Sequence, residues 1–215
     1  MKIARMLLIG ILPIAILLGS AYTIILNQSW YEKEFEKLGV YGHFNKPKQE
    51  INNEAVNIIA FLKGRGSLDT DFLNAKEKSH MSDVRNIIEK YGIVTYVVVM
   101  AALMLLFQTR KDKKALVYAG FSSLICLGVF LVISATMFSS VFLKFHEVLF
   151  ANDFWLLDPA TDNLIKLFPE QFFIDALKQI IKESITISIM VIIIGSYRTY
   201  IAMLKQKAYI NKKSI

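Results

Sequence analysis

Four long runs of apolar residues divide this 215-residue chain. Each run approaches or exceeds the roughly 20 residues that an α-helix needs to cross a bilayer. Hydrophobic residues make up 54% of the chain, which is more than is usual for a soluble domain. The runs therefore predict an all-α membrane protein with four transmembrane helices. The expected spans cover residues 6–26, 88–107, 116–138 and 182–203.

Lysine and arginine are distributed unevenly around these spans. The flanks at residues 1–5, 108–115 and 198–215 carry net charges of +2, +3 and +5. The two long remaining segments, residues 27–90 and 139–180, carry net charges of 0 and −3. Because positive flanks stay on the cytoplasmic side, both termini are expected to be cytoplasmic. The net charge of +7 thus reflects topology and gives no reason to expect nucleic acid as a partner.

The length fits a single membrane domain over residues 1–215. Residues 27–87 and 139–181 are expected to form an extracytoplasmic subdomain of helices and loops. The first apolar run follows two basic residues, as the core of a cleaved signal peptide would. It continues through residues 24–26, however, and this favours an uncleaved anchor. The prediction is a multi-pass protein of the cell membrane.

Helical spacing recurs in the expected outer segments. The apolar side chains of residues 50–62 fall on one face, which predicts an amphipathic helix that packs in the subdomain or lies on the headgroups. Ser79 is expected to cap a helix that begins at His80 and continues into the second span. Thr161 is expected to cap a short helix, and Pro169 to occupy the first turn of the helix that leads to the fourth span.

Two histidines are expected at similar depth outside the membrane. His80 lies eight residues before the second span, and His146 lies eight residues after Phe138. If both helices continue straight, each imidazole lies roughly 12 Å beyond the hydrocarbon edge. Asp83 shares a helix face with His80. Its carboxylate either orients the imidazole or is simply an acid that the helix dipole favours in the first turn. The remaining histidine, His43, is expected to be structural.

Imidazole acts as acid and base near neutral pH, so the histidine pair is a candidate catalytic centre. A metal site would need Glu147 or Asp153 as well, and no metal-ligand spacing such as HExxH occurs in the sequence. The sequence also has no nucleophile elbow and no glycine-rich phosphate loop. The single cysteine, Cys126, lies in an apolar run and is expected only to pack. Neither a metal nor another cofactor is expected.

Two motifs resemble the signatures of the bacterial lipoprotein intramolecular transacylase (Lit) family. The first is Ser79-His80-Met81-x-Asp83-Val84, preceded by Phe72-Leu73-Asn74. The second comprises, in order, Phe145-His146-Glu147, Asn152-Asp153, Trp155, Leu157, Asp158-Pro159 and Leu167-Phe168-Pro169. The resemblance extends over nearly the whole chain. Residues 75–78 depart from the family pattern, but both histidines are present.

The resemblance implies a four-helix membrane bundle with an extracytoplasmic crevice that contains the active site. Members of the family are acyltransferases. They move an acyl chain from the S-diacylglyceryl group of a bacterial lipoprotein to the α-amino group of its own N-terminal cysteine, giving the N-acyl lyso form. The implied partners are diacylglyceryl-modified lipoproteins and membrane lipid. The family's two functional histidines would fall on His80 and His146, acting as acid and base without an acyl-enzyme.

In this interpretation His80 is the general base, positioned by Asp83. His146 stabilises the oxyanion or acts as general acid, and Glu147 or Asp153 tunes it; the reverse assignment of the histidines is also open. Three aromatic residues either line the substrate crevice or anchor the chain at the interface: Phe142, Phe150 and Trp155. Two alternative functions stay open, a non-enzymatic membrane accessory or sensor protein and an outer-leaflet metal-binding protein.

Overall fold

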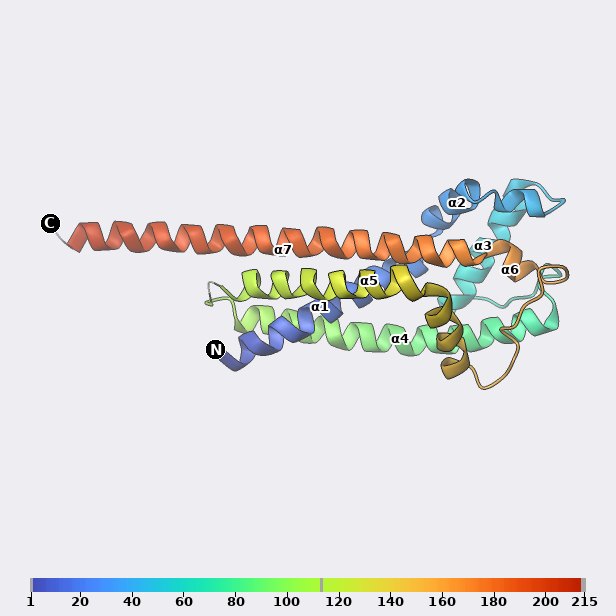
Figure 1. The fold of residues 1–215 in the computed structure, drawn as a ribbon, viewed down its shortest axis with the longest axis horizontal. Helices are drawn as coiled ribbons and strands as arrows, with labels where there is room; N and C mark the ends of the chain where they lie inside the picture. The colour runs from blue at the N-terminus through green and yellow to red at the C-terminus, as the bar shows by residue number, and fades with distance from the viewer. Residues whose placement is uncertain (1, 113, 214–215) are drawn as a thin grey trace. The chain divides into compact units, whose positions relative to one another are not determined.

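The computed structural model describes residues 2–112 and 114–213 of the chain. Within this part every regular element is a helix, which confirms the predicted all-α class (Figure 1). The elements are α1 (Lys2–Ile25), α2 (Gln28–Lys37), the short 3-10 helix η1 (Val40–His43), α3 (Lys48–Leu62), α4 (Ala75–Gln108), α5 (Ala115–Leu149), α6 (Asn163–Leu167) and α7 (Glu170–Lys213). Helices α1, α4, α5 and α7 each contain a stretch long and apolar enough to cross a membrane.

The helices form two compact units. We call the first the span unit; it comprises Met1–Ser20, Thr95–Ile133 and Ile180–Ile215. We call the second the histidine unit; it comprises Ala21–Val94 and Ser134–Gln179 and contains both His80 and His146. The single domain over residues 1–215, the span boundaries and the sidedness of the termini stay predictions.

The span unit is held together by small and aliphatic side chains. Its buried core comes from α1, α4 and α5 and comprises Leu8, Leu12, Ala15, Ile16, Ala102, Leu105, Ala115 and Ala119. The hydroxyl of Ser122 on α5 donates a hydrogen bond to the carbonyl of Ile9 on α1, at 2.6 Å. Many other large apolar side chains of these helices are exposed. An apolar exterior together with small residues such as alanine and serine at the helix contacts is typical of helices that pack within lipid.

Two glycines allow α5 and α7 to approach closely. A Cβ atom at Gly120 would lie 2.5 Å from Cγ1 of Ile192, and one at Gly195 would lie 2.8 Å from Cβ of Leu116. The Cβ at Gly195 would also lie 2.9 Å from the backbone nitrogen of Val117, which no side-chain rotation can relieve. These contacts explain why glycine stands at both positions.

The core of the histidine unit is larger and contains many aromatic rings. Its fully buried members include Phe35, Val40, Ile51 and Leu167, which come from four different elements. Helix α3 confirms the helix predicted over residues 50–62. All five of its predicted apolar positions are buried in this core: Ile51, Ala55, Ile58, Ile59 and Leu62. Burial of this face supports the packing interpretation rather than a helix lying on headgroups.

Helix α4 begins at Ala75, so the predicted start at His80 with a Ser79 cap is wrong. The side chain of Asn74 accepts a hydrogen bond from the backbone N–H of Glu77 at 3.0 Å, and the Glu77 carboxylate accepts one from the N–H of Asn74 at 2.7 Å. This reciprocal pair is a capping box. Since it starts the helix five residues earlier, the Ser79 hydroxyl lies inside the helix and donates to the Ala75 carbonyl.

Helix α5 is not straight. Met137 has non-helical backbone angles (φ −131°, ψ 19°), so the helix is kinked nine residues before His146. The predicted depth of His146 assumed a straight helix beyond Phe138, and the kink removes that assumption. The start of α6 also differs from the prediction, because the residue at its N-cap position is Asp162 rather than Thr161.

Candidate active site

The imidazole rings of His80 and His146 are neighbours in the histidine unit. Their centroids lie 6.3 Å apart and their planes are inclined by 33°. His80 lies in the second turn of α4, and His146 lies in the segment of α5 after the kink. The structure thus brings together the two histidines that the sequence singled out.

His80 is the buried member of the pair, with 7% of its surface exposed. It lies outside the apolar stretch of α4, because Asp83, Arg85, Glu89 and Lys90 intervene. Its ring packs against Phe150, with centroids 4.9 Å apart. Among the described residues its buried Nδ1 atom has no hydrogen-bond partner. Such unpaired buried polar atoms are rare and often occur at functional sites.

Burial, followed by the nearby His146, lowers the pKa of His80 from 6.5 to about 4, and the charge of Asp83 opposes the shift. Burial acts in this direction because it disfavours the charged imidazolium. His80 is therefore neutral at physiological pH. A neutral imidazole carries one N–H donor and one nitrogen acceptor.

His146 is half-buried, and a backbone contact fixes its ring. Its Nδ1 atom lies 2.7 Å from the carbonyl oxygen of Phe142, one helical turn earlier. Because a carbonyl oxygen only accepts hydrogen bonds, Nδ1 carries the hydrogen. In the neutral ring the Nε2 atom then holds the free lone pair. His146 is thus oriented like the base of a catalytic triad, with the Phe142 carbonyl in place of the acid.

The three aromatic residues predicted to line a crevice all contact the histidines. The ring centroid of His146 lies 4.4 Å from that of Phe142, 5.5 Å from that of Phe150 and 5.2 Å from that of Trp155. Phe150 also contacts His80 and is itself buried. The pair therefore lies among apolar rings, where electrostatic interactions are stronger than in water.

Asp83 is close enough to influence His80 through its charge, but its carboxylate accepts its hydrogen bond from another side chain. The amide of Asn152 donates to Asp83 at 2.9 Å. This bond joins α4 to the loop that follows His146. Asn152 belongs to the second motif but was not predicted to be a site residue.

The other two predicted supporting carboxylates face elsewhere. Glu147 forms an exposed ion pair with Lys144 at 2.8 Å. The Asp153 side chain is exposed, and the hydrogen bond at this residue is the one from the backbone N–H of Leu156 to its carbonyl. Within the described residues neither carboxylate is bonded to a histidine, so a tuning role for either rests on the sequence alone.

Glu77 is a supporting residue that the sequence analysis missed. It is buried, with 1% of its surface exposed, one turn before His80. Besides the N–H of Asn74, its carboxylate accepts the backbone N–H of Leu164 in α6 at 2.5 Å. The Asn74 amide donates in turn to Asp162 at 2.8 Å. These bonds, which we call the Glu77 clamp, join the helix of His80 to the chain after His146. The spacing Asn-x-x-Glu was its sequence signal.

The described residues offer no metal-ligand set. Among residues 2–112 and 114–213, no three histidine, cysteine, aspartate or glutamate side chains are grouped as metal ligands. The rings that contact the two histidines are aromatic, and Asp83 is the one carboxylate whose charge influences the pKa of His80 among the described residues. The metal-binding alternative therefore finds no donor set at this pair.

Four apolar helices and a pair of neighbouring histidines define the class: a membrane-integral protein with a candidate acid–base centre. Residues 6–173 match the sequence model of the family Lipoprotein intramolecular transacylase Lit. The chain belongs to this family, and the family is one of acyltransferases.

Solved structures agree with this assignment. The chain is similar to the membrane-integral lipoprotein intramolecular transacylase Lit from Bacillus cereus, with a TM-score of 0.80, 25% identity and 97% of each chain covered. It is also similar in fold to a variant of that protein in which a histidine is replaced by alanine, with a TM-score of 0.81, 23% identity and 94% of this chain and 95% of the other covered. A comparison with curated proteins found no match.

Proposed function

We propose that this protein is a lipoprotein intramolecular transacylase that uses His80 and His146 as its acid–base pair. The acyl chain would move from the S-diacylglyceryl group to the α-amino group of the lipoprotein's N-terminal cysteine. Family membership supports the reaction. The observation that carries the catalytic assignment is the pair of rings with centroids 6.3 Å apart among apolar side chains.

The reaction needs one proton to move. The α-amino nitrogen attacks the ester carbonyl and forms the N–C bond; the C–O bond to glycerol then breaks. The nitrogen loses a proton and the departing glyceryl oxygen gains one, so a single imidazole can accept and then return it. The second imidazole is left to stabilise the tetrahedral oxyanion.

The contacts of each ring favour His146 as the base and His80 as the group that stabilises the oxyanion. This is the reverse of the assignment first made from the sequence. His146 has its Nδ1 hydrogen held by the Phe142 carbonyl, which leaves Nε2 to take the amine proton and deliver it to the glyceryl oxygen. His80 has its pKa lowered to about 4, so it is a weak base and stays neutral. A neutral imidazole in a site of low polarity is suited to donate a hydrogen bond to an oxyanion.

No acyl-enzyme is required in this proposal, because donor ester and acceptor amine belong to the same lipid-modified cysteine. Holding the two groups in attack geometry can contribute an effective molarity on the order of 10⁵ M or more. Phe142, Phe150 and Trp155 would contact the acyl chains and exclude water, which would otherwise hydrolyse the ester. The distribution of lysine and arginine supports an extracytoplasmic position for this site.

Mass spectrometry of lipoprotein N-termini tests the function in cells. Cells expressing the wild-type chain should convert diacylglyceryl lipoproteins to the N-acyl lyso form, and His80→Ala and His146→Ala should each abolish conversion. His43→Ala is the matched control, because its exposed histidine lies in η1. Wild-type conversion by either active-site variant would reject the histidine roles, and no conversion by the wild type would reject the function.

A further inference from the structure

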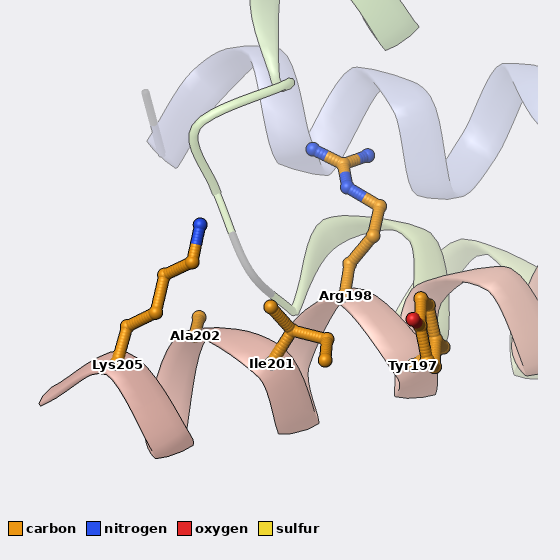
Figure 2. A pocket seen from close by; sticks show the side chains of 5 residues that line it. All are labelled: Tyr197, Arg198, Ile201, Ala202 and Lys205. Atoms are coloured by element: carbon orange, nitrogen blue, oxygen red, sulfur yellow. The ribbon is translucent and has the colours of Figure 1, made fainter. Parts of the chain in front are cut away.

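A pocket lies in the span unit at the C-terminal part of α7. Tyr197, Arg198, Ile201, Ala202 and Lys205 line it. Figure 2 shows the side chains of Arg198 and Lys205 extending from the same side of α7. The lining therefore combines two cations, a tyrosine and two apolar side chains, and it contains no acid. This composition suits an anionic group attached to an apolar body.

The acidic residue within the basic α4–α5 loop is already paired. Asp112 lies 3.2 Å from the guanidinium of Arg5 on α1. Arg198 donates instead to the backbone carbonyl of Arg110. Among the described residues, neither Arg198 nor Lys205 has a carboxylate within ion-pair distance. Two cations that line one pocket without an acidic partner repel each other, and a bound anion would relieve that repulsion.

The position of the pocket along α7 indicates where the anion comes from. The apolar stretch of α7 ends near residue 203, so the pocket lies where a spanning helix reaches the headgroups. Tyr197 and Tyr200 are exposed at this level, as tyrosines at a membrane interface are. Exposed apolar residues of α7, such as Ile193 and Ile194, precede it and would contact acyl chains.

We propose that Arg198 and Lys205 bind the phosphate of an anionic phospholipid headgroup in this pocket. Arginine supplies directed hydrogen bonds to phosphate oxygens, and lysine supplies a mobile point charge. Ile201 and Ala202 contact the glycerol end of the acyl chains. The lipid binds as a structural ligand in the span unit and takes no part in acyl transfer.

The test measures lipid retention by the purified full-length protein. The protein is equilibrated with vesicles of phosphatidylcholine and phosphatidylglycerol and extracted in detergent. Native mass spectrometry then measures which lipid stays bound to it. Wild type should retain phosphatidylglycerol in preference to phosphatidylcholine. Lys205→Gln should retain about tenfold less, because it removes a charge-assisted hydrogen bond to the phosphate, which contributes about 1.4 kcal/mol. Arg198→Gln should lose as much or more, but it also removes the bond to Arg110.

Lys207→Gln is the matched control. This exposed lysine carries the same charge two residues away but does not line the pocket. Equal losses from Lys205→Gln and Lys207→Gln would overturn the proposal, since they would indicate only a diffuse attraction. Displacement of the lipid by millimolar inorganic phosphate would also overturn it, because the pocket would then belong to a soluble ligand. Failure of either kind leaves the acyl-transfer function untouched.

Discussion

The Nδ1 atom of His146 lies 2.7 Å from the Phe142 carbonyl, and the ring it orients lies beside buried His80. This relationship gives the two histidines different properties. One has its Nδ1 hydrogen held by a backbone carbonyl, and the other is held neutral by burial. Pairs of titratable groups whose environments differ in this way commonly divide acid–base roles.

Acid should destabilise the protein through His80. Its pKa is about 4 in the folded protein and 6.5 when unperturbed. Between these values the unfolded chain binds a proton that the folded protein excludes. The stability linked to neutral His80 is therefore fully present above pH ~6.5 and is lost as the pH falls toward 4, by at most about 3 kcal/mol.

Thermal unfolding in detergent checks this pH dependence. Between about pH 7 and pH 4.5, the apparent unfolding temperature should fall further for wild type than for His80→Asn, whose side chain at this position does not titrate. Both proteins share the acid sensitivity of their carboxylates, so the difference between them isolates His80. Equal losses in the two proteins would contradict the lowered pKa.

The Glu77 clamp should contribute strongly to stability. Glu77→Gln leaves one oxygen for two backbone donors and places an amide N–H against one of them, so we expect a loss of about 2–4 kcal/mol. Glu89→Gln is the control on the same helix, because Glu89 pairs with Arg85 at the surface. It should change stability by less than ~1 kcal/mol. Unfolding temperatures compare the two variants, and similar values would show that the clamp is dispensable.

Close packing of α5 and α7 should depend on Gly195. Gly195→Ala places a Cβ against Leu116 and the backbone of Val117, which should cost about 1–3 kcal/mol. Gly128→Ala is the matched control, because nothing lies within 4 Å of its added Cβ. The control should keep or slightly raise the unfolding temperature, since alanine favours helix. A Gly195→Ala protein as stable as the control would contradict the packing described.

Asp83 should matter more for activity than Glu147. Asp83→Ala removes the acceptor of the Asn152 amide, and with it the bond that joins the helix of His80 to the loop after His146. We expect the rate of lipopeptide conversion to fall about tenfold, which is a loss of about 1.4 kcal/mol in the transition state. Glu147→Gln should leave the rate within about twofold, because Glu147 pairs with Lys144 at the surface. A larger fall in rate for Glu147→Gln than for the Asp83 variant would instead identify Glu147 as the supporting acid.

The spans and α3 were predictable because each depends on a regular local pattern. Apolar length identified the four membrane helices, and helical spacing identified the five buried residues of α3. The start of α4 was mispredicted because two capping signals compete. Ser79 has a favoured capping residue type, but Asn74 and Glu77 satisfy two backbone groups together and start the helix earlier.

Other features depend on tertiary contacts that no local pattern reports. The kink at Met137 has no proline or glycine beside it. The bond between Asp83 and Asn152 joins residues 69 positions apart. The two histidines were predicted from their similar depth and from the family motifs, and their aromatic neighbours from the resemblance, but the orientation of the His146 ring required the structure.

A crossover experiment tests the central claim most directly. Two synthetic diacylglyceryl lipopeptides of different peptide mass, one with deuterated acyl chains, are mixed with the purified protein, and the products are sequenced by tandem mass spectrometry. The account predicts N-acyl lyso products in which each peptide keeps its own acyl label, and no product with His146→Ala. Exchange of labels between peptides, or wild-type conversion by His146→Ala, would contradict it.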